Sequence, residues 1–556
     1  MSTGPAASPG HRADSAGRAG LAAIAVSVAL TFTVAVLGPS LMEPALPGRP
    51  GQPPWAFAAH PSPYLVVALT AAAILAGAAG LALTLRAGRQ GWAVSPRTLL
   101  VAGIIAAAAL ALVPPFGSSD HLSYASYGRM VVTGHNPFTT TPAALAQLGD
   151  PVARAVQDWR TSPSVYGSVA TGLQALASLI GGTSVRLTVF VLSLLGAAAF
   201  AVTGLLLHQM TRGDARRQQR AALMWTCNPL MLQVLVAGAH VDSQAIVFGV
   251  AALTIFCRYA TSPARPARQG LAAAGAGALI GLGFAVKATM ALIGAGLAIA
   301  CVLAWRRTRP GEPGDRAGFR ELMRLLGGLA VGFGLAAGAS LVYWGPSSLT
   351  PALREGSFVS IGTPWRFVRY LVHLAAGEAT AEDLVKIGAV LLALALLALL
   401  LRSVSAADPR VWPHVPGLAS PGDPPDRTVD AARSLLGAFA VCAAFAVAFA
   451  WLVAWPYVLP WYDGLGWALL ALLPWSRLDW LLLVRTTALA LGYLPARVAG
   501  IVMPADLGWL QSVVRTALTP AALLAVMVAL VVLLWPRPSK SAPGPAAAGS
   551  RAQARL

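Results

Sequence analysis

Apolar runs of the length needed to cross a lipid bilayer recur along almost the whole chain. A membrane-spanning helix needs about 20 predominantly apolar residues, and the runs predict about 14 spans, with a range of about 12 to 15. We therefore expect an all-α, polytopic integral membrane protein. The expected spans cover residues 21–41, 64–85, 99–115, 186–208, 221–239, 243–259, 271–286, 288–305, 322–343, 385–401, 435–455, 465–474, 481–494 and 519–535.

The segments between these runs predict one membrane domain over residues 20–536 with a disordered tail at each end, 1–19 and 537–556. Two polar segments are too long for simple connectors, and we expect short helices outside the bilayer in both. A further run, 166–180, breaks the alternation of sides that the basic loops require. We predict that it is re-entrant or lies on the surface, which requires that protein buries it. The long loops cover 116–164 and 344–384, and a Pro-rich linker covers 403–433.

Composition and charge limit the classes of protein to which the chain can belong. Only 11% of the residues are charged, against about a quarter in soluble proteins, which excludes a soluble globular protein. The net charge of +19 would suggest a nucleic-acid partner in a soluble chain, but most basic residues lie in short loops, where they orient the spans. This distribution predicts no nucleic-acid partner, cytoplasmic termini and linker, and external long loops. The many Ala and Gly residues and the excess of Arg over Lys are typical of a GC-rich genome. We therefore expect a bacterial plasma membrane.

The first long loop carries the leading candidate for chemistry. Asp120 follows the span 99–115 directly and precedes a short helix that bears Tyr124 and Tyr127. A carboxylate at this position can meet the head group of a lipid-borne substrate while an acceptor arrives from water. It can equally serve as the N-cap of a helix that starts at His121, and the sequence leaves both interpretations open.

In this loop and beyond, the chain resembles the GT-C glycosyltransferases, which carry a membrane-proximal Asp in the first external loop. In detail it resembles the actinobacterial polyprenol-phosphomannose-dependent alpha-1,6-mannosyltransferases. It departs from them at Val241, where the family has Asn, and at Ser168, where the family has Pro. The matching segments are Asp120-x-x-x-Tyr124-x-x-Tyr127-Gly128, Gly134-His135-Asn136-Pro137-Phe138, Pro163-Ser164-Val165-Tyr166-Gly167, Asn228-Pro229-Leu230 followed by His240-Val241-Asp242, and Pro456-Tyr457-x-x-Pro460-Trp461-Tyr462.

The resemblance implies a GT-C-like bundle that transfers mannose from polyprenyl-phosphate-mannose to a glycolipid or mannan acceptor, a growing alpha-1,6-mannan of a lipoglycan core. The reaction would invert the anomeric centre on the external face, with Asp120 as the general base. The two departures leave an arabinofuranosyl or other lipid-phosphate-sugar transferase as an alternative. A lipid or sugar transporter or flippase is the alternative from another class, although the two halves show no internal repeat of the kind common in transporters.

Several further residues are candidates because polar or aromatic side chains near external helix ends suit sugar or phosphate binding. Each has a structural alternative, such as a solvated loop charge, a buried polar pair, an aromatic belt or, for Arg366 and Arg369, an amphipathic interfacial helix. No cofactor is indicated, and a divalent cation held by Asp120, His121, His240 and Asp242 is left open. The substrate-binding candidates are His121, Tyr124, His135, Asn136, Asp158, Tyr166, His240, Asp242, Trp461 and Tyr462, and the phosphate-binding candidates are Lys287, Arg366 and Arg369.

Overall fold

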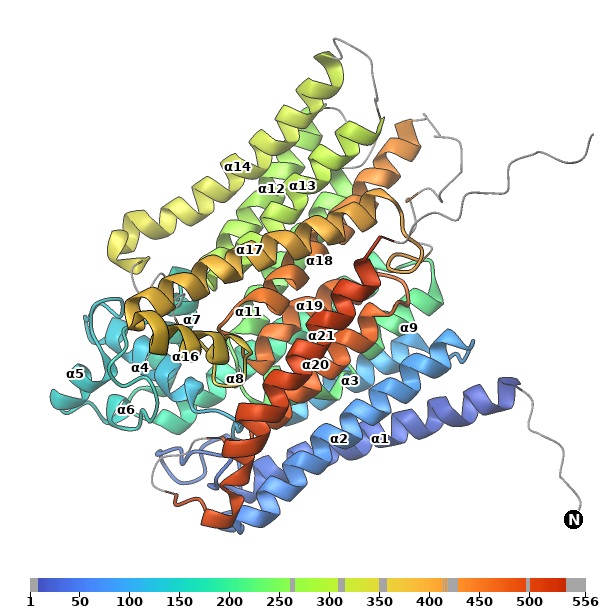
Figure 1. Ribbon diagram of the computed structural model, residues 1–556. Coiled ribbons are helices and arrows are strands. Elements are labelled where there is room, and N and C mark those ends of the chain that lie inside the picture. Colours follow the sequence, from blue (N-terminus) through green and yellow to red (C-terminus); the bar gives the residue numbers. More distant parts are fainter. Residues whose placement is uncertain are drawn as a thin grey trace, which may run out of the picture.

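The computed structural model describes residues 9–260, 266–308, 316–349, 358–413, 415, 418, 429–496 and 501–536. Over these residues every regular element is a helix, which confirms the expected all-α class, and the only β-pairing is an isolated bridge between Ser40 and Glu43. Figure 1 shows one bundle, with the short helices α4–α7 and α16 gathered at one end. The first turn of α1 and the last turn of α21 lie at the opposite end.

The longer helices form the body of the bundle, and shorter helices fill its interior and its ends (Figure 1). The longer ones are α1 (Pro9–Leu37), α2 (Pro63–Arg89), α3 (Pro96–Ala111), α8 (Val185–Met210), α11 (Asp242–Ile255), α12 (Pro266–Phe284), α13 (Ala291–Thr308), α14 (Arg316–Trp344), α17 (Glu378–Ser405), α18 (Val429–Ala454), α20 (Leu478–Gly492) and α21 (Thr519–Leu534). The shorter ones are α4 (Asp120–Val132), α5 (Pro142–Gln147), α6 (Pro151–Arg154), α7 (Ser168–Gly181), α9 (Ala215–Met224), α10 (Pro229–Met231), α16 (Trp365–Ala376) and α19 (Asp463–Leu470).

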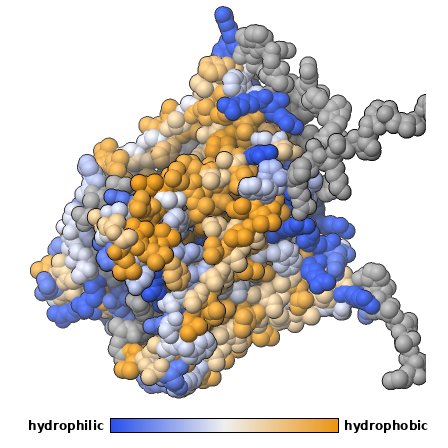
Figure 2. Space-filling view, in the orientation of Figure 1, coloured by the Kyte–Doolittle hydropathy of each residue, from blue (hydrophilic) through white to orange (hydrophobic). Residues whose placement is uncertain are grey.

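Within the described residues, eight helices are long and apolar enough to cross a membrane. Figure 2 shows their apolar side chains over the middle of one face, with hydrophilic side chains toward its ends. This arrangement supports a multi-pass membrane protein. The expected count of about 14 spans is not confirmed, because several of the apolar runs form shorter helices.

Two of the expected spans are not continuous helices. In 221–239, α9 stops at Met224, and the chain resumes as α10 and the π-helix η1 (Leu232–Ala237). The break is built by Asn228, whose side chain accepts the first N–H groups of α10, and by Pro229. In 465–474 only residues 465–470 are helical, as part of the eight-residue α19, which is about 12 Å long. Such breaks are tolerated at membrane depth where protein surrounds them, and both segments are buried here.

The expected disorder of residues 1–19 is wrong for the part that the structure describes. Helix α1 begins at Pro9 and packs along α2. Ala13 is only 2% exposed, and a Cβ on Gly17 would meet the ring of Trp92 at 2.3 Å. The reason is tertiary packing, because small residues allow the first turns of α1 to lie close against the chain that follows α2. Residues 1–8 and 537–556 lie outside the described part of the chain.

The long loops also contain regular helices and buried side chains. Loop 344–384 contains α16 and the first turns of α17, which begins at Glu378. The described part of the 403–433 linker is anchored by Trp412, which is 3% exposed and whose indole N–H donates to Ser403 Oγ at 2.8 Å. Most of the linker beyond residue 413 lies outside the described residues.

Two glycines position the polar end of the bundle. A Cβ on Gly128 would lie 2.1 Å from the carbonyl oxygen of Gln174, so α4 and α7 cross in direct backbone contact. A Cβ on Gly167 would lie 2.3 Å from the Ala285 oxygen. At this second crossing the N–H of Gly167 donates to the carbonyl of Val286 at 3.2 Å, where α12 has ended. Helix α7 has 14 residues, about 21 Å, and lies against α4 and α8 rather than crossing the full thickness of a bilayer.

Candidate active site

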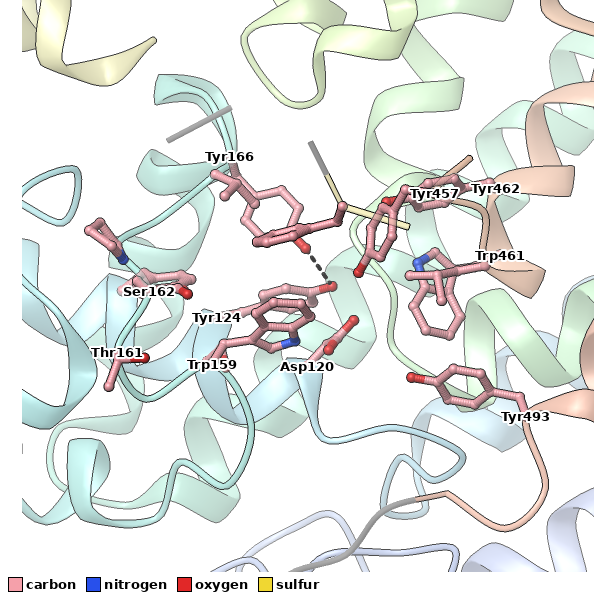
Figure 3. A pocket seen from close by; sticks show the side chains of 16 residues that line it. Asp120, Tyr124, Trp159, Thr161, Ser162, Tyr166, Tyr457, Trp461, Tyr462 and Tyr493 are labelled. Atoms are coloured by element: carbon pink, nitrogen blue, oxygen red, sulfur yellow. Dashed lines mark hydrogen bonds between the residues drawn. The ribbon is translucent and has the colours of Figure 1, made fainter. Parts of the chain in front are cut away.

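A cavity lies at the end of the bundle that carries α4–α7 (Figure 3). Its volume is about 910 Å³, part of which is open to solvent. Most of the lining side chains are aromatic, and one is a carboxylate. The described residues that line it are Asp120, Ser123, Tyr124, Tyr127, Trp159, Thr161, Ser162, Pro163, Val165, Tyr166, Phe358, Tyr457, Leu459, Trp461, Tyr462 and Tyr493.

Asp120 presents its carboxylate to this cavity. It is the first residue of α4, and the N-cap position belongs to Ser119, whose side chain makes no capping hydrogen bond. The Asp120 side chain is 14% exposed and points toward the space between the aromatic rings (Figure 3). The structure therefore does not use Asp120 as the cap of α4.

His240 lies directly behind Asp120. Its Nδ1 is 3.6 Å from Asp120 Oδ2, and its Nε2 is 3.3 Å from Ser118 Oγ. The imidazole stacks on the indole of Trp461, with ring centroids 3.5 Å apart and planes inclined by 15°. His240 does not line the cavity and is 2% exposed. It therefore packs against both the Asp120 carboxylate and the Trp461 indole, beneath the lining of the cavity.

Tyr124 and Tyr166 form the wall next to Asp120. Their rings meet edge-on at 5.1 Å, and the Tyr166 hydroxyl donates to that of Tyr124 at 3.3 Å. Burial, together with the nearby Asp120 carboxylate, raises the pKa of Tyr124 well above its usual value. The Tyr124 hydroxyl therefore stays protonated. Tyr124 and Tyr166, both predicted to bind substrate, are about forty positions apart in the sequence and meet in the structure.

In the loop that follows α6, Asp158 makes hydrogen bonds to α4 and its neighbour Trp159 lines the cavity. Asp158 Oδ2 accepts a hydrogen bond from Ser119 Oγ at 2.7 Å, and its carbonyl accepts one from Ser123 Oγ at 3.2 Å. Asp158 does not line the cavity, whereas Trp159 does, facing Phe358 at 5.8 Å. Trp159 has a φ of +60°, which is uncommon for a bulky residue. The hydrogen bond to the Asp158 carbonyl anchors the backbone next to Trp159. The uncommon backbone conformation of Trp159 then brings its indole to the cavity.

His135 and Asn136 lie in a turn outside the cavity. Asn136 Oδ1 accepts the N–H of Phe138 at 2.9 Å, which closes an Asx turn. The carbonyl of Pro137 accepts the N–H of Ser164 at 2.8 Å. The predicted substrate-binding pair is therefore placed to support the segment 163–166, which does line the cavity.

Lys287 and Asp242 form a buried ion pair, with Nζ 2.7 Å from Oδ1. The ammonium also lies 3.7 Å from the centroid of the Tyr462 ring, a cation–π contact. Tyr462 lines the cavity, but Lys287 and Asp242 do not. The lysine predicted to bind phosphate is thus engaged by a carboxylate beneath the aromatic wall.

Arg366 and Arg369 lie on α16, away from the residues that line the cavity. Arg369 pairs with Glu378, its Nε lying 3.0 Å from Oε1. Helix α16 has no buried residue, and the apolar side chains of Phe367 and Leu371 are 50% and 64% exposed. This surface agrees with the amphipathic interfacial helix that the sequence offered as the alternative. Among the described residues that line the cavity none is Lys or Arg.

The groups considered for a divalent cation do not come together as a ligand cluster. His121 is fully buried and does not line the cavity, and burial lowers its pKa to about 3. Asp242 is paired with Lys287. Over the part of the chain that the structure describes, no group of three or more His, Cys, Asp or Glu side chains is arranged to hold a metal ion.

Sequence reasoning missed some of the lining residues. Trp159 stood next to a candidate carboxylate in a long loop, and that position was a usable signal. Tyr493 follows the end of α20, and its ring meets Trp461 edge-on at 5.2 Å. No motif marks Tyr493, because only the packing of α20 beside 457–462 brings it to the cavity.

Comparisons with known proteins point in one direction. Residues 17–304, more than half of the chain, match the family model described as alpha-(1->6)-mannopyranosyltransferase, N-terminal domain. The chain is 25% identical over 134 residues to alpha-(1->6)-mannopyranosyltransferase A of Corynebacterium glutamicum, covering 24% of this chain and 27% of that protein. It is 29% identical over 157 residues to alpha-(1->6)-mannopyranosyltransferase B of the same organism, covering 27% of this chain and 25% of that protein. The matches thus span about a quarter of the length of these curated relatives.

Among solved structures, the chain is similar to the archaeal oligosaccharyltransferase AglB from Archaeoglobus fulgidus, in complex with an inhibitory peptide and a dolichol-phosphate. The identity is 15%, and the match covers 79% of this chain and 55% of that chain with a TM-score of 0.35. A similarity at this level does not establish a common fold.

Proposed function

Because the chain belongs to the alpha-(1->6)-mannopyranosyltransferase family, we propose that it is a membrane mannosyltransferase that acts at the cavity around Asp120. The donor is mannose linked to a polyprenyl phosphate, and the acceptor is a growing alpha-1,6-mannan on the external face of a bacterial plasma membrane. One observation carries this proposal: a carboxylate stands in an aromatic cavity at the polar end of an apolar helical bundle. Aromatic rings offer apolar faces on which a sugar can pack.

In the proposed reaction, Asp120 accepts the proton of an acceptor hydroxyl. The acceptor oxygen forms a bond to the anomeric carbon of mannose, the bond from that carbon to the phosphate oxygen breaks, and polyprenyl phosphate leaves with the bonding electrons. General-base catalysis of this kind requires a carboxylate within hydrogen-bond reach of the acceptor. His240, whose Nδ1 lies 3.6 Å from Asp120 Oδ2, packs behind the base and limits the orientations open to its carboxylate.

The stereochemistry is proposed to be inverting. Retaining transfer through a covalent intermediate uses two carboxylates about 5–5.5 Å apart. Asp120 is the only carboxylate among the described residues that line the cavity. A single base suits one direct displacement, in which a beta-linked phosphomannose gives an alpha linkage.

A transfer assay with the purified full-length protein in lipid nanodiscs tests this function. The donors are polyprenyl-phosphate mannose, polyprenyl-phosphate arabinofuranose and a nucleotide-linked mannose, and the acceptor is a short alpha-1,6-linked mannoside. We expect mannose transfer from the first donor alone, with an alpha-1,6 product linkage by NMR. Transfer only from the arabinofuranose donor would support the pentosyl alternative. Movement of the donor between leaflets without transfer would support a flippase.

Trp159→Ala is expected to lower kcat/KM for the acceptor up to about tenfold, because loss of one aromatic stacking contact costs about 0.5–1.5 kcal/mol. Trp159→Phe should keep most of the activity, since it retains an aromatic face. The control is Trp55→Ala, an exposed tryptophan outside the cavity. Equal activity of Trp159→Ala and the unmodified protein at limiting acceptor would remove Trp159 from the acceptor site.

A further inference from the structure

A second, larger cavity lies at the opposite end of the bundle from Asp120. Its volume is about 1030 Å³, and four separate segments contribute to it. They are the last residue of α2, the turn after α17, the start of α20 and one face of α21. Nothing in the proposed transfer reaction uses this groove, and the inference drawn from it is independent of that reaction.

Three arginines converge on this groove. They are Arg89, Arg410 and Arg477. Arg477 is the exposed N-cap residue of α20 between two buried neighbours, Ser476 and Leu478, so the local backbone fixes where it emerges.

A buried ion pair between Arg220 and Asp479 fixes the backbone next to Arg477. Asp479 lies within the first turn of α20 and is 2.7 Å from the Arg220 guanidinium, and both side chains are 1% exposed. The Arg220 guanidinium also lies 4.8 Å from the centre of the Trp475 ring. A Cβ on Gly88 would meet that ring at 2.7 Å. The end of α2 and the start of α20 are therefore packed into one body, which keeps Arg89 and Arg477 at the same groove.

The groove carries uncompensated positive charge. Arg410 is paired with Asp408 at 2.5 Å, and no carboxylate is present among the described residues that line the groove. Arg89 and Arg477 are both exposed. The positive-inside rule explains arginines in loops on one side of a membrane, but orientation alone does not require them to meet at one cavity.

The remaining walls are apolar and continue onto an exposed apolar surface. Trp480 and Leu481 come from α20, and Ala529, Val532 and Leu533 come from one face of α21. Val532 is 63% exposed, so this wall merges with the side of the bundle that lipid would cover. A cationic rim above an apolar wall matches a molecule with an anionic head and a hydrocarbon chain.

We propose that this groove binds one anionic phospholipid, with its phosphate beside Arg89 and Arg477 and an acyl chain along α20 and α21. Arg410 completes the rim while paired with Asp408. Arginine suits this role because its planar guanidinium binds phosphate in a bidentate manner. The lipid would bridge α2, α20 and α21 and so tie the last helix to the bundle.

Native mass spectrometry of the delipidated full-length protein tests the proposal. The probe is dioleoyl phosphatidylglycerol, compared with dioleoyl phosphatidylcholine, which has the same chains, and with inorganic phosphate. We expect one phosphatidylglycerol to be retained in preference to phosphatidylcholine, without displacement by millimolar phosphate. The double variant Arg89→Gln/Arg477→Gln should weaken retention by about 25-fold, at about fivefold per arginine. Arg89→Lys/Arg477→Lys should keep much of it.

The matched control is Arg86→Gln/Arg212→Gln. It removes the same charge from two exposed arginines outside the groove, one of them a single helical turn from Arg89. The control should retain the lipid as the unmodified protein does. Equal loss in both double variants would show a response to net charge only and would overturn the site. Retention of phosphatidylcholine to the same extent, or displacement by inorganic phosphate, would overturn the anionic phospholipid as its occupant.

Discussion

Asp120→Asn is expected to lower kcat for mannose transfer by a factor of about 10²–10⁴, the usual contribution of a positioned general base. Asparagine keeps the size and one hydrogen-bonding oxygen of the side chain but cannot accept the acceptor's proton. KM should change little, because the aromatic walls that bind the substrates are untouched. Steady-state transfer kinetics of the purified variant measure both parameters.

Asp150→Asn is the matched control for this variant. Asp150 lies in the same loop, does not line the cavity and caps α6 by accepting the N–H groups of Val152 and Ala153. Asn is as good an N-cap as Asp, and the ion pair with Arg129 that it weakens lies outside the cavity lining, so this variant should keep its activity within a few-fold. If Asp120→Asn were as active as the control, Asp120 would not be the base.

Lys287→Met is expected to destabilise the protein by about 3–5 kcal/mol, because it leaves the buried Asp242 carboxylate without its partner. The double variant Lys287→Met/Asp242→Asn should recover most of that loss, since no buried charge remains unpaired. Thermal unfolding in detergent compares the variants. Arg369→Met, which opens the exposed pair with Glu378, should cost only about 0–1 kcal/mol.

The double variant also separates two roles for Lys287. If Lys287 serves the fold, a stable double variant retains mannose transfer. If it instead neutralises the departing phosphate, as the sequence suggested, the double variant folds but loses transfer. The contact of Lys287 with the Tyr462 ring makes the stable, active outcome our expectation.

The all-α membrane class was predictable because a bilayer imposes its own length and polarity on every helix. Helices α2, α8 and α14 follow their apolar runs closely. The breaks in α9–η1 and α19 were hidden by the same apolar sequence, since residues packed inside a bundle are as hydrophobic as residues that face lipid. In α9–η1 only Asn228 and Pro229 hinted at the interruption.

At the candidate site, local motifs predicted Asp120, Tyr124, Tyr166, Trp461 and Tyr462, and all five line one cavity. Pairings between distant positions could not be read from the sequence. Lys287 and Asp242 are 45 positions apart, and their ion pair depends on how α11 meets the end of α12. The placement of Trp159 depends on a backbone conformation at φ +60°, which has no sequence signature here.

A cryo-electron microscopy structure of the Asp120→Asn protein with polyprenyl-phosphate mannose bound tests most directly whether the cavity around Asp120 is the donor site. We expect density for the mannosyl phosphate in the aromatic cavity, with the anomeric carbon facing residue 120 and the sugar packed on Trp461. Density for the head group elsewhere on the protein, with the aromatic cavity empty at saturating donor, would contradict it.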